Sequence, residues 1–279
     1  PDYTITSTEY HNDTYGYTLT LPDSFVGQGY VKETDSVVKF GLQNALPGIS
    51  DDPTDGGAVM WLDIQATAVL KAQFGEDWQA GHPVPCKELA ERDGLTYYLA
   101  FASDVQYDIN DEDITAAYTE MSAAAYAMGA DAISFDGQTD AQRDAVRTLL
   151  LHDLAMQYAY TLTRRDGSTI DTVTAEPDLT DGSCLLTVRY TDRTHTRFFT
   201  VSQRLWYEGT DSITPMRTET LVDTSDGIDS RADFLLAFPQ GQDIPVMDRT
   251  GIDALLAAPT SNPEQDAERV LGLSGGTGE

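Results

Sequence analysis

Histidine and cysteine are the side chains best suited to act as bases or nucleophiles near neutral pH, and this chain has four histidines and two cysteines. His152 stands beside Asp153 in a stretch with helical periodicity, and His195 lies close to Asp192 at an expected hairpin. Either imidazole has an acidic neighbour that would orient it as a base, although histidines in such places are more often surface or core residues. Gly-x-Ser-x-Gly, His-Glu-x-x-His and phosphate-binding glycine motifs are absent. The sequence therefore predicts no catalytic residue.

Metal ligands would have to come from one histidine–cysteine pair or from acidic runs. His82 and Cys86 are four residues apart, but two prolines between them prevent the helix that would align both side chains. The run that starts at Asp51 fails the EF-hand pattern, because its twelfth position is Leu62 where a bidentate glutamate is required. The run at 108–113 has no central glycine and suits the start of a helix. No metal ligand and no cofactor are predicted; these runs are expected to be solvated loops, with calcium binding as the alternative.

Aromatic residues give the one positive indication of a binding site. Tyrosines are concentrated in the first half of the chain, together with two of the three tryptophans. Flat amphipathic rings stack on sugars or anchor a protein partner. The predicted ligand-binding residues are Trp61, Trp78, Tyr97 and Tyr98. The alternative interpretation is that these rings belong to half-buried antiparallel strands, where tyrosine is common.

Charge and hydrophobicity exclude several classes of protein. The 279 residues include 17 Lys and Arg against 46 Asp and Glu, which gives a net charge of −29. A field of that sign repels nucleic acids and anionic lipid surfaces. Hydrophobic residues make up 41% of the chain, enough for a sizeable core, and no apolar run approaches the roughly 20 residues that span a bilayer. The two cysteines, Cys86 and Cys184, are too few to define a disulfide scaffold, and the sequence leaves open whether they are bridged.

Hydrophobic periodicity predicts an α+β fold with two domains, each an antiparallel sheet covered by helices. The first domain is expected at 1–137, ending at the Asp136-Gly137 turn. Its expected elements are strands at 15–21, 38–42, 60–66 and 97–101, a long loop at 43–58 and a helix at 111–129.

The second domain is expected at 138–279 and begins with an amphipathic helix at 140–160. Strands follow at 169–175, 184–190, 195–206 and 218–222, with turn residues between them, which predicts a meander. Two helical segments, near 230–238 and 251–258, and a disordered glycine-rich tail are expected at the end. Helix-then-meander is similar to cystatin-like or nuclear-transport-factor-like rolls only by analogy.

A family resemblance rests on Tyr10–Phe25, which reads YHNDTYGYTLTLPDSF, and on the Ser134-Phe135 pair. A Tyr-Gly-aromatic strand ending in Leu-Pro-x-Ser-aromatic, with a later Ser-Phe pair after a helix, resembles extracytoplasmic lipoprotein domains of Gram-positive bacteria (Firmicutes). The resemblance covers about residues 3–136 and implies a Mog1/PsbP-like fold at the cell surface, without one shared activity. The second half resembles no family.

Two functions are compatible with these observations. The first is a noncatalytic extracytoplasmic binding or interaction module of a bacterial cell-surface lipoprotein, with an unknown surface ligand or protein partner. Membrane attachment is then expected only through an N-terminal lipid anchor outside this chain. The alternative is a secreted hydrolase acting on glycans or peptides, with its site built from His152, His195 and dispersed carboxylates.

Overall fold

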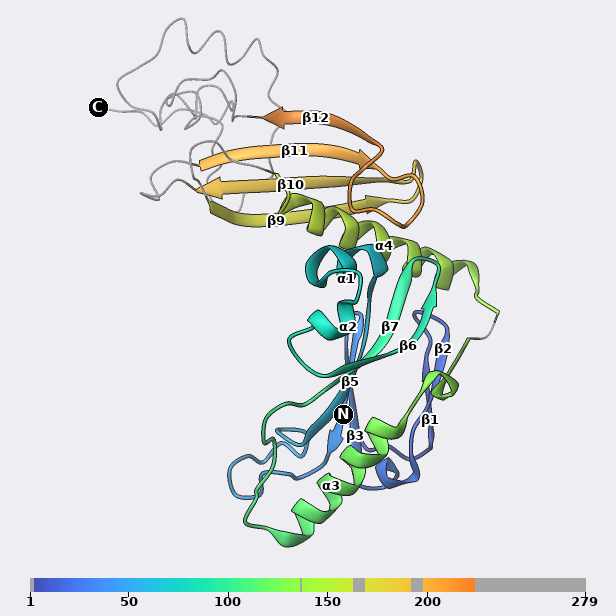
Figure 1. The fold of residues 1–279 in the computed structure, drawn as a ribbon, viewed down its shortest axis with the longest axis vertical. Coiled ribbons are helices and arrows are strands. Elements are labelled where there is room, and N and C mark those ends of the chain that lie inside the picture. Colours follow the sequence, from blue (N-terminus) through green and yellow to red (C-terminus); the bar gives the residue numbers. More distant parts are fainter. Residues whose placement is uncertain (1–2, 136, 163–168, 192–197, 224–279) are drawn as a thin grey trace, which may run out of the picture. The chain divides into compact units, whose positions relative to one another are not determined.

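The computed structural model describes residues 3–135, 137–162, 169–191 and 198–223 (Figure 1). The structure is α+β with antiparallel sheets, as the sequence predicts. The chain divides into two compact units: unit 1 is Pro1–Asp153 with Gly209–Ile213, and unit 2 is Leu154–Glu208 with Thr214–Glu279. The helix α4 (Asp140–Ala159) contributes residues to both units.

A five-stranded antiparallel sheet with the strand order β3-β4-β5-β7-β6 forms the centre of unit 1 (Figure 1). Its strands are β3 Gly29–Thr34, β4 Val37–Leu42, β5 Ala58–Ala66, β6 Cys86–Arg92 and β7 Leu95–Phe101. The strands predicted at 38–42, 60–66 and 97–101 are all present. The period-two pattern does not predict the two edge strands β3 and β6, because their exposed and half-buried positions carry charged side chains.

A smaller sheet of β1 (Glu9–Asn12), β2 (Tyr17–Thr20) and β8 (Ile133–Phe135) has the order β1-β2-β8. The strand predicted at 15–21 begins only at Tyr17, because the chain turns at Gly16, which has a φ of +69°. Within this sheet Tyr17 pairs with Phe135, so the two motifs on which the family resemblance rests are hydrogen-bonded neighbours.

Aromatic side chains fill the core of unit 1. Tyr17 on β2 meets Tyr97 on β7 edge to face at 5.8 Å, and Tyr97 meets Phe135 on β8 at 4.9 Å. Tyr10 on β1 meets Phe40 on β4 at 5.3 Å. Edge-to-face pairs at such separations are favourable beyond the area that they bury, so these contacts hold the two sheets together.

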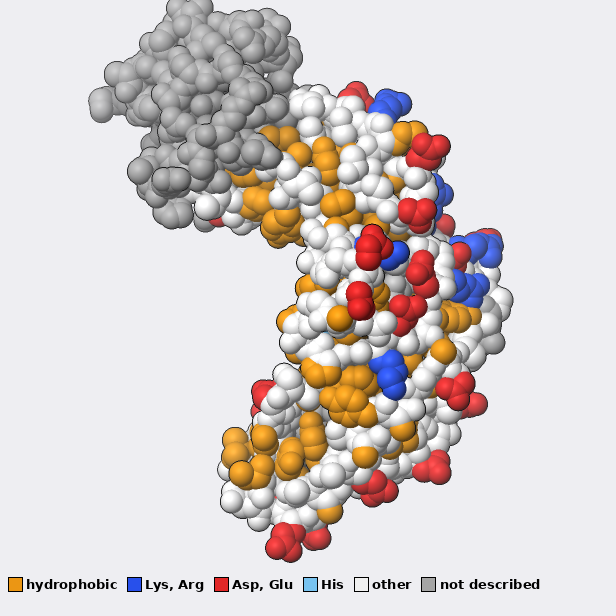
Figure 2. Space-filling view, in the orientation of Figure 1, with side chains coloured by type: hydrophobic (Ala, Val, Ile, Leu, Met, Phe, Trp, Pro, Cys, Tyr) orange, Lys and Arg blue, Asp and Glu red, His pale blue; other side chains and the backbone are white. Residues whose placement is uncertain are grey.

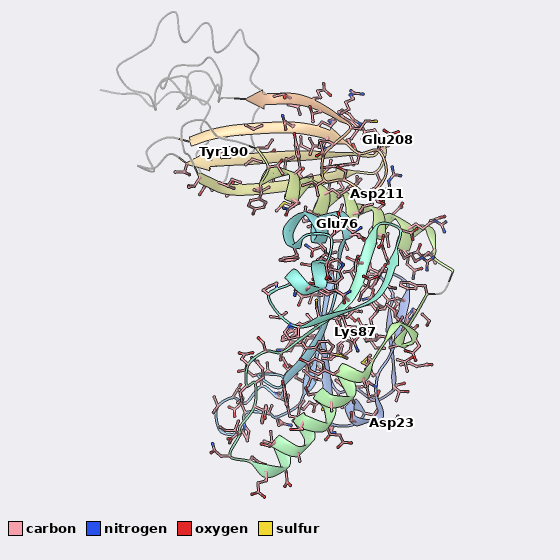
Figure 3. The ribbon with its side chains drawn as sticks, in the orientation of Figure 1. Asp23, Glu76, Lys87, Tyr190, Glu208 and Asp211 are labelled. Atoms are coloured by element: carbon pink, nitrogen blue, oxygen red, sulfur yellow. The ribbon has the colours of Figure 1, made fainter. Side chains whose placement is uncertain are left out.

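The helix predicted at 111–129 is present as α3 (Glu112–Ala127). Asp111 is its N-cap, since the carboxylate accepts hydrogen bonds from the backbone amides of Asp113 (3.0 Å) and Ile114 (3.1 Å). At its other end the ammonium of Lys87, labelled in Figure 3, donates to the carbonyls of Tyr126 (2.6 Å) and Met128 (2.8 Å). A cation at free helix carbonyls is stabilising, so β6 fixes the end of this helix.

Two short helices, α1 (Thr67–Phe74) and α2 (Trp78–Gly81), follow β5 and are not predicted by the sequence pattern. Leu70 and Trp78 from these helices form a buried cluster with Tyr98 and Ala100 of β7. Helices of eight and four residues give too few turns for the 3.6-residue period to stand out. A second core therefore lies on the face of β7 that carries Tyr98.

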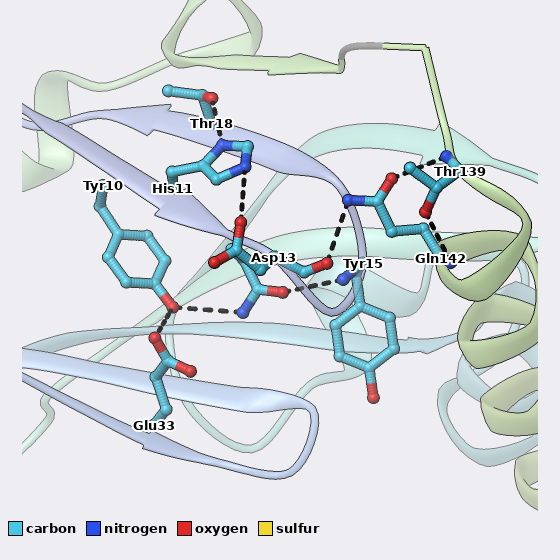
Figure 4. A network of polar contacts seen from close by, with 9 residues as sticks. Tyr10, His11, Asp13, Tyr15, Thr18, Glu33, Thr139 and Gln142 are labelled. Carbon is cyan, nitrogen blue, oxygen red and sulfur yellow. Dashed lines mark hydrogen bonds and ion pairs between the residues drawn. The ribbon is translucent and has the colours of Figure 1, made fainter.

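The helix α4 begins with a capping box, drawn in Figure 4. The hydroxyl of Thr139 accepts a hydrogen bond from the backbone amide of Gln142 at 3.2 Å. The side-chain oxygen Oε1 of Gln142 accepts one from the backbone amide of Thr139 at 2.9 Å. The side-chain nitrogen Nε2 of Gln142 also donates to the backbone carbonyl of Asp13 at 3.0 Å, in the turn between β1 and β2. One side chain therefore starts the helix and docks it on the hairpin. The helix predicted at 140–160 matches α4 within one residue.

Unit 2 contains a four-stranded meander with the order β12-β11-β10-β9. Its strands are β9 Thr169–Asp178, β10 Ser183–Thr191, β11 Phe198–Trp206 and β12 Arg217–Asp223, which confirms the predicted succession. On β10 the buried residues Cys184, Leu186 and Val188 alternate with half-buried ones, so one face of the sheet is core. The helical segments and the tail predicted after residue 223 lie outside the described residues.

Candidate functional site

Three of the four aromatic residues predicted to bind a ligand lie in the cores. Tyr97 is 0% exposed, and Trp78 and Tyr98 are buried, with their rings 5.1 Å apart. Trp61, on the same face of β5 as Asp63, is half-buried. The structure therefore brings Trp78 and Tyr98 together, but as packing partners. Tyr97 and Tyr98 are strand residues of β7, as the alternative interpretation expects, whereas Trp78 lies on α2.

A half-buried carboxylate, that of Asp63, lies beside Tyr98. The hydroxyl of Tyr98 donates to Asp63 at 3.0 Å. Burial raises the pKa of Asp63, and this effect outweighs the hydrogen bond from Tyr98, which lowers it. His82 packs edge-on against Tyr98 at 5.6 Å, and its ring nitrogen Nδ1 lies 2.9 Å from the carbonyl oxygen of Val84.

The two histidines proposed as bases have different outcomes. His152 lies on α4 with Nδ1 3.4 Å from a carboxylate oxygen of Asp153, and the hydrogen bond between them raises the pKa of the imidazole. The other Asp153 oxygen accepts a hydrogen bond from the amide of Ala66 at 3.1 Å, directly before α1. Asp153 thus stabilises the start of α1 as well as orienting His152. His195 lies outside the described residues.

A threonine–histidine–aspartate chain occurs on the β1–β2 hairpin (Figure 4). His11 Nδ1 lies 3.0 Å from the hydroxyl of Thr18, and His11 Nε2 lies 3.1 Å from a carboxylate oxygen of Asp13. The side chain of Asp13 is 97% exposed and that of His11 is 45% exposed. Water screens such a pair, so the geometry lacks the buried acid that makes a histidine an effective base for a hydroxyl nucleophile.

Metal and thiol chemistry have little support in the described part of the chain. There, no group of three or more His, Cys, Asp or Glu side chains is arranged to hold a metal ion. Cys86 and Cys184 are both free thiols. Burial raises the pKa of Cys86, and it raises that of Cys184 to about 12, so neither forms a thiolate readily at neutral pH.

Two loops that are far apart in the sequence meet at one end of the five-stranded sheet. Residues 43–57 connect β4 to β5, and residues 102–111 connect β7 to α3. The amide of Gly57 donates to the carbonyl of Gln106, and the amide of Asp108 donates to the carbonyl of Ala45 at 2.8 Å. We call these two hydrogen-bonded loops, residues 43–57 and 102–111, the loop platform.

Glycine and tyrosine residues fix the conformation of the loop platform. A Cβ at Gly56 would lie 2.6 Å from Leu46 Cδ1 and 2.8 Å from the Gln106 carbonyl oxygen, so both loops close tightly on this residue. The hydroxyl of Tyr30 donates to the Gly56 carbonyl at 2.8 Å. In the second loop, Tyr107 stacks on Tyr118 of α3 at 4.3 Å. The backbone of the platform is therefore tied to β3 and α3.

Large apolar side chains project from this fixed backbone. Ile49 is 76% exposed, and Val105 and Ile109 are each 63% exposed. Leu46, whose side chain lies next to Gly56, is half-buried, and Pro47 is exposed. Figure 2 shows hydrophobic side chains gathered over this end of the unit. Leaving several large aliphatic side chains in water is costly, and such a cluster is typical of an interaction surface.

Carboxylates are numerous in the same segments as the apolar side chains. The platform and the first two residues of α3 contain no Lys or Arg, and their eight acidic residues are Asp51, Asp52, Asp55, Asp104, Asp108, Asp111, Glu112 and Asp113. Asp52 pairs with Lys32 of β3 at 3.4 Å. Its side chain also accepts from the amide and hydroxyl of Thr54, and these hydrogen bonds lower its pKa. The platform thus combines exposed apolar side chains with these eight carboxylates, which we call its rim.

The local sequence pattern does not predict the loop platform. The residues 43–58 are correctly predicted as a loop, and the two acidic runs are recognised, but each is considered alone. The available signal is the presence of Leu46, Ile49, Val105 and Ile109 in polar, turn-rich segments, where they have no periodicity. Only the pairing of β5 with β4 and β7 brings the two loops to the same end of the sheet.

No protein-family model, curated protein or solved structure matches the chain. Among the described residues, no helix has the length and hydrophobicity to cross a membrane.

Proposed function

We propose that this protein is a noncatalytic interaction module that binds another protein through the loop platform. The observation that carries this proposal is the exposure of Ile49, Val105 and Ile109 on a backbone that hydrogen bonds and glycines hold fixed. A backbone that is already ordered loses little conformational entropy on binding, which favours affinity.

The shape of the surface supports a protein partner over a small molecule. The three apolar side chains project outward, whereas small-molecule sites are concave and usually of about 300–1,000 Å³. A depression of 150 Å³ beside the N-terminal segment, lined by Thr4, Ile5, Glu9 and Tyr10 among others, is smaller than that range. Projecting aliphatic residues suit a groove on a partner protein.

We further propose that unit 1 is a Mog1/PsbP-like domain of an extracytoplasmic lipoprotein, and that two domains make up the chain. The pairing of Tyr17 with Phe135, which joins the Tyr-Gly-Tyr strand to the Ser-Phe pair, supports the first proposal. The division into two compact units supports the second. A lipobox cysteine encoded upstream of this chain, with incorporation of labelled palmitate, would support attachment at the cell surface. A cytoplasmic location of the tagged protein would contradict it.

The interaction proposal is tested with a phage-displayed library of random twelve-residue peptides, panned on the full chain. The comparison protein carries Ile49→Ser, Val105→Ser and Ile109→Ser, which change exposed side chains and keep the backbone contacts. We expect peptides that bind the parent and lose binding to the triple variant. Enriched peptides that bind both proteins equally, or no enrichment at all, would overturn the proposal. Circular dichroism and urea midpoints confirm that the variant is folded.

A further inference from the structure

The rim of the loop platform specifies which kind of partner it fits. Six carboxylates lie within the two loops and two more begin α3, and no cation lies in these segments. Asp51, Asp55 and Asp104 are exposed, and Asp51 and Asp104 are close in sequence to Ile49 and Val105. Lys32 of β3 pairs with Asp52, and Lys39 of β4 interacts electrostatically with Asp52 and Asp55, so the other rim carboxylates supply the charge left for a partner. An apolar centre with a rim of one sign calls for the opposite sign on the partner.

We propose that the occupant of the loop platform is a cationic polypeptide surface, in which apolar residues contact Ile49, Val105 and Ile109 while Lys or Arg side chains meet the rim. This inference rests on the proposed function, because it assumes that the platform is the docking surface. It adds the chemistry of the partner.

Charge argues against three other occupants. A second copy of this chain, docked platform to platform, would place two anionic rims against each other. An anionic lipid surface and a nucleic acid are repelled both by the rim and by the net charge of −29. A neutral partner would bury the apolar side chains but leave the rim carboxylates desolvated without partners, which costs free energy.

The test uses three synthetic twelve-residue peptides as probes for the full chain. The first alternates lysine with leucine and isoleucine, the second has glutamate in place of lysine, and the third has serine in place of the apolar residues. We expect the first to bind, with an affinity that falls as salt rises from 50 to 500 mM, since the Debye length shortens from roughly 14 to 4 Å. The second should not bind, and the third should bind at least about tenfold more weakly than the first.

A rim variant separates local charge from net charge. Asp51, Asp55, Asp104 and Asp113 are exposed, and their replacement by Asn removes four rim charges. The control variant replaces Glu76 and Glu91 by Gln and Asp131 and Asp144 by Asn, at four exposed positions outside the platform and the first turn of α3. We expect the rim variant to bind the cationic peptide about tenfold more weakly at 50 mM salt, since each exposed ion pair contributes a few-fold. The control should change binding less than twofold.

The outcomes distinguish the two proposals. Loss of binding in the Ile49/Val105/Ile109 triple variant, with equal binding of the lysine and glutamate peptides, would keep the docking surface and overturn the cationic partner. Peptides that bind the triple variant as tightly as the parent would overturn the docking surface itself. Equal weakening in the rim and control variants would show that net charge acts without the platform. Self-association in sedimentation experiments, or binding to phosphatidylglycerol vesicles, that the triple variant abolishes would replace the cationic partner by a second copy or a lipid surface.

Discussion

The backbone amide of Asp108 donates a hydrogen bond of 2.8 Å to the carbonyl of Ala45, although these residues belong to loops far apart in the sequence. With the bond from Gly57 to Gln106, it makes one surface out of two connections. A loop held at several backbone positions by a neighbouring loop behaves as part of the scaffold. This relationship is the reason that the apolar residues of the platform project from a fixed backbone.

Replacing Gly57 by Ala should destabilise the loop platform. Gly57 has a φ of +62°, and a Cβ there would lie 2.1 Å from the carbonyl oxygen of Leu42, so the backbone must shift. We expect the free energy of unfolding to fall by about 2–4 kcal/mol, from strain and overpacking together. Urea unfolding followed by tryptophan fluorescence measures this change.

Gly48→Ala is the matched control for that substitution. Its φ is +78°, but a Cβ there meets nothing within 4 Å, so only the conformational penalty of about 1 kcal/mol remains. Equal losses in the two variants would contradict the tight closure of the loops at Gly57.

Replacing Gln142 by Ala should weaken both the start of α4 and its contact with the hairpin. The variant loses the hydrogen bonds to the amide of Thr139 and to the carbonyl of Asp13. We expect a loss of about 1–2 kcal/mol in the free energy of unfolding. Gln142→Glu keeps the acceptor for Thr139 and removes the donor to Asp13, so it should fall between the parent and the alanine variant. A glutamate variant as stable as the parent would show that the hairpin contact contributes nothing.

The carboxyl of Asp63 should make stability depend on pH in the acidic range. Burial raises its pKa above the ordinary value, so the folded state binds the proton more tightly than the unfolded chain does. Its contribution is therefore fully present below the unfolded pKa of about 3.9 and is lost as the pH rises through the higher folded pKa. Relative to Asp63→Asn, the parent should lose stability between about pH 4 and neutrality. A difference that stays constant, or that grows in favour of the parent with pH, would contradict this assignment.

The imidazole of His152 should make the stability of the protein depend on pH above about 6.5. Its hydrogen bond to Asp153 raises its pKa, so the stabilisation is complete below the unfolded pKa of about 6.5 and disappears as the pH rises through the folded pKa. The difference in urea midpoint between the parent and His152→Gln should therefore shrink above about pH 6.5. NMR titration of the His152 ring measures the pKa directly; a value at or below 6.5 would rule out the pairing in solution.

Periodic segments are where the sequence predicts the structure well. The stripe at 111–129 and the acidic residues before it correspond to α3 and its Asp111 cap, and the helix predicted at 140–160 corresponds to α4. Long amphipathic helices and central strands carry their periodicity in many residues, so local pattern suffices. The short helix at Trp78 and the edge strand β3 carry it in few residues, and they become helix and strand through their packing.

The sequence by itself determined an acidic α+β protein with strands and helices near their observed places, and a polar loop at 43–58. Tertiary structure decided which apolar residues are hidden: Tyr97 and Trp78 are buried, whereas Ile49 and Val105 are exposed. A side chain's type sets how much free energy its burial would yield, but its burial depends on which other segments cover it. That covering is decided by strand pairing between residues distant in the chain, and local sequence does not contain it.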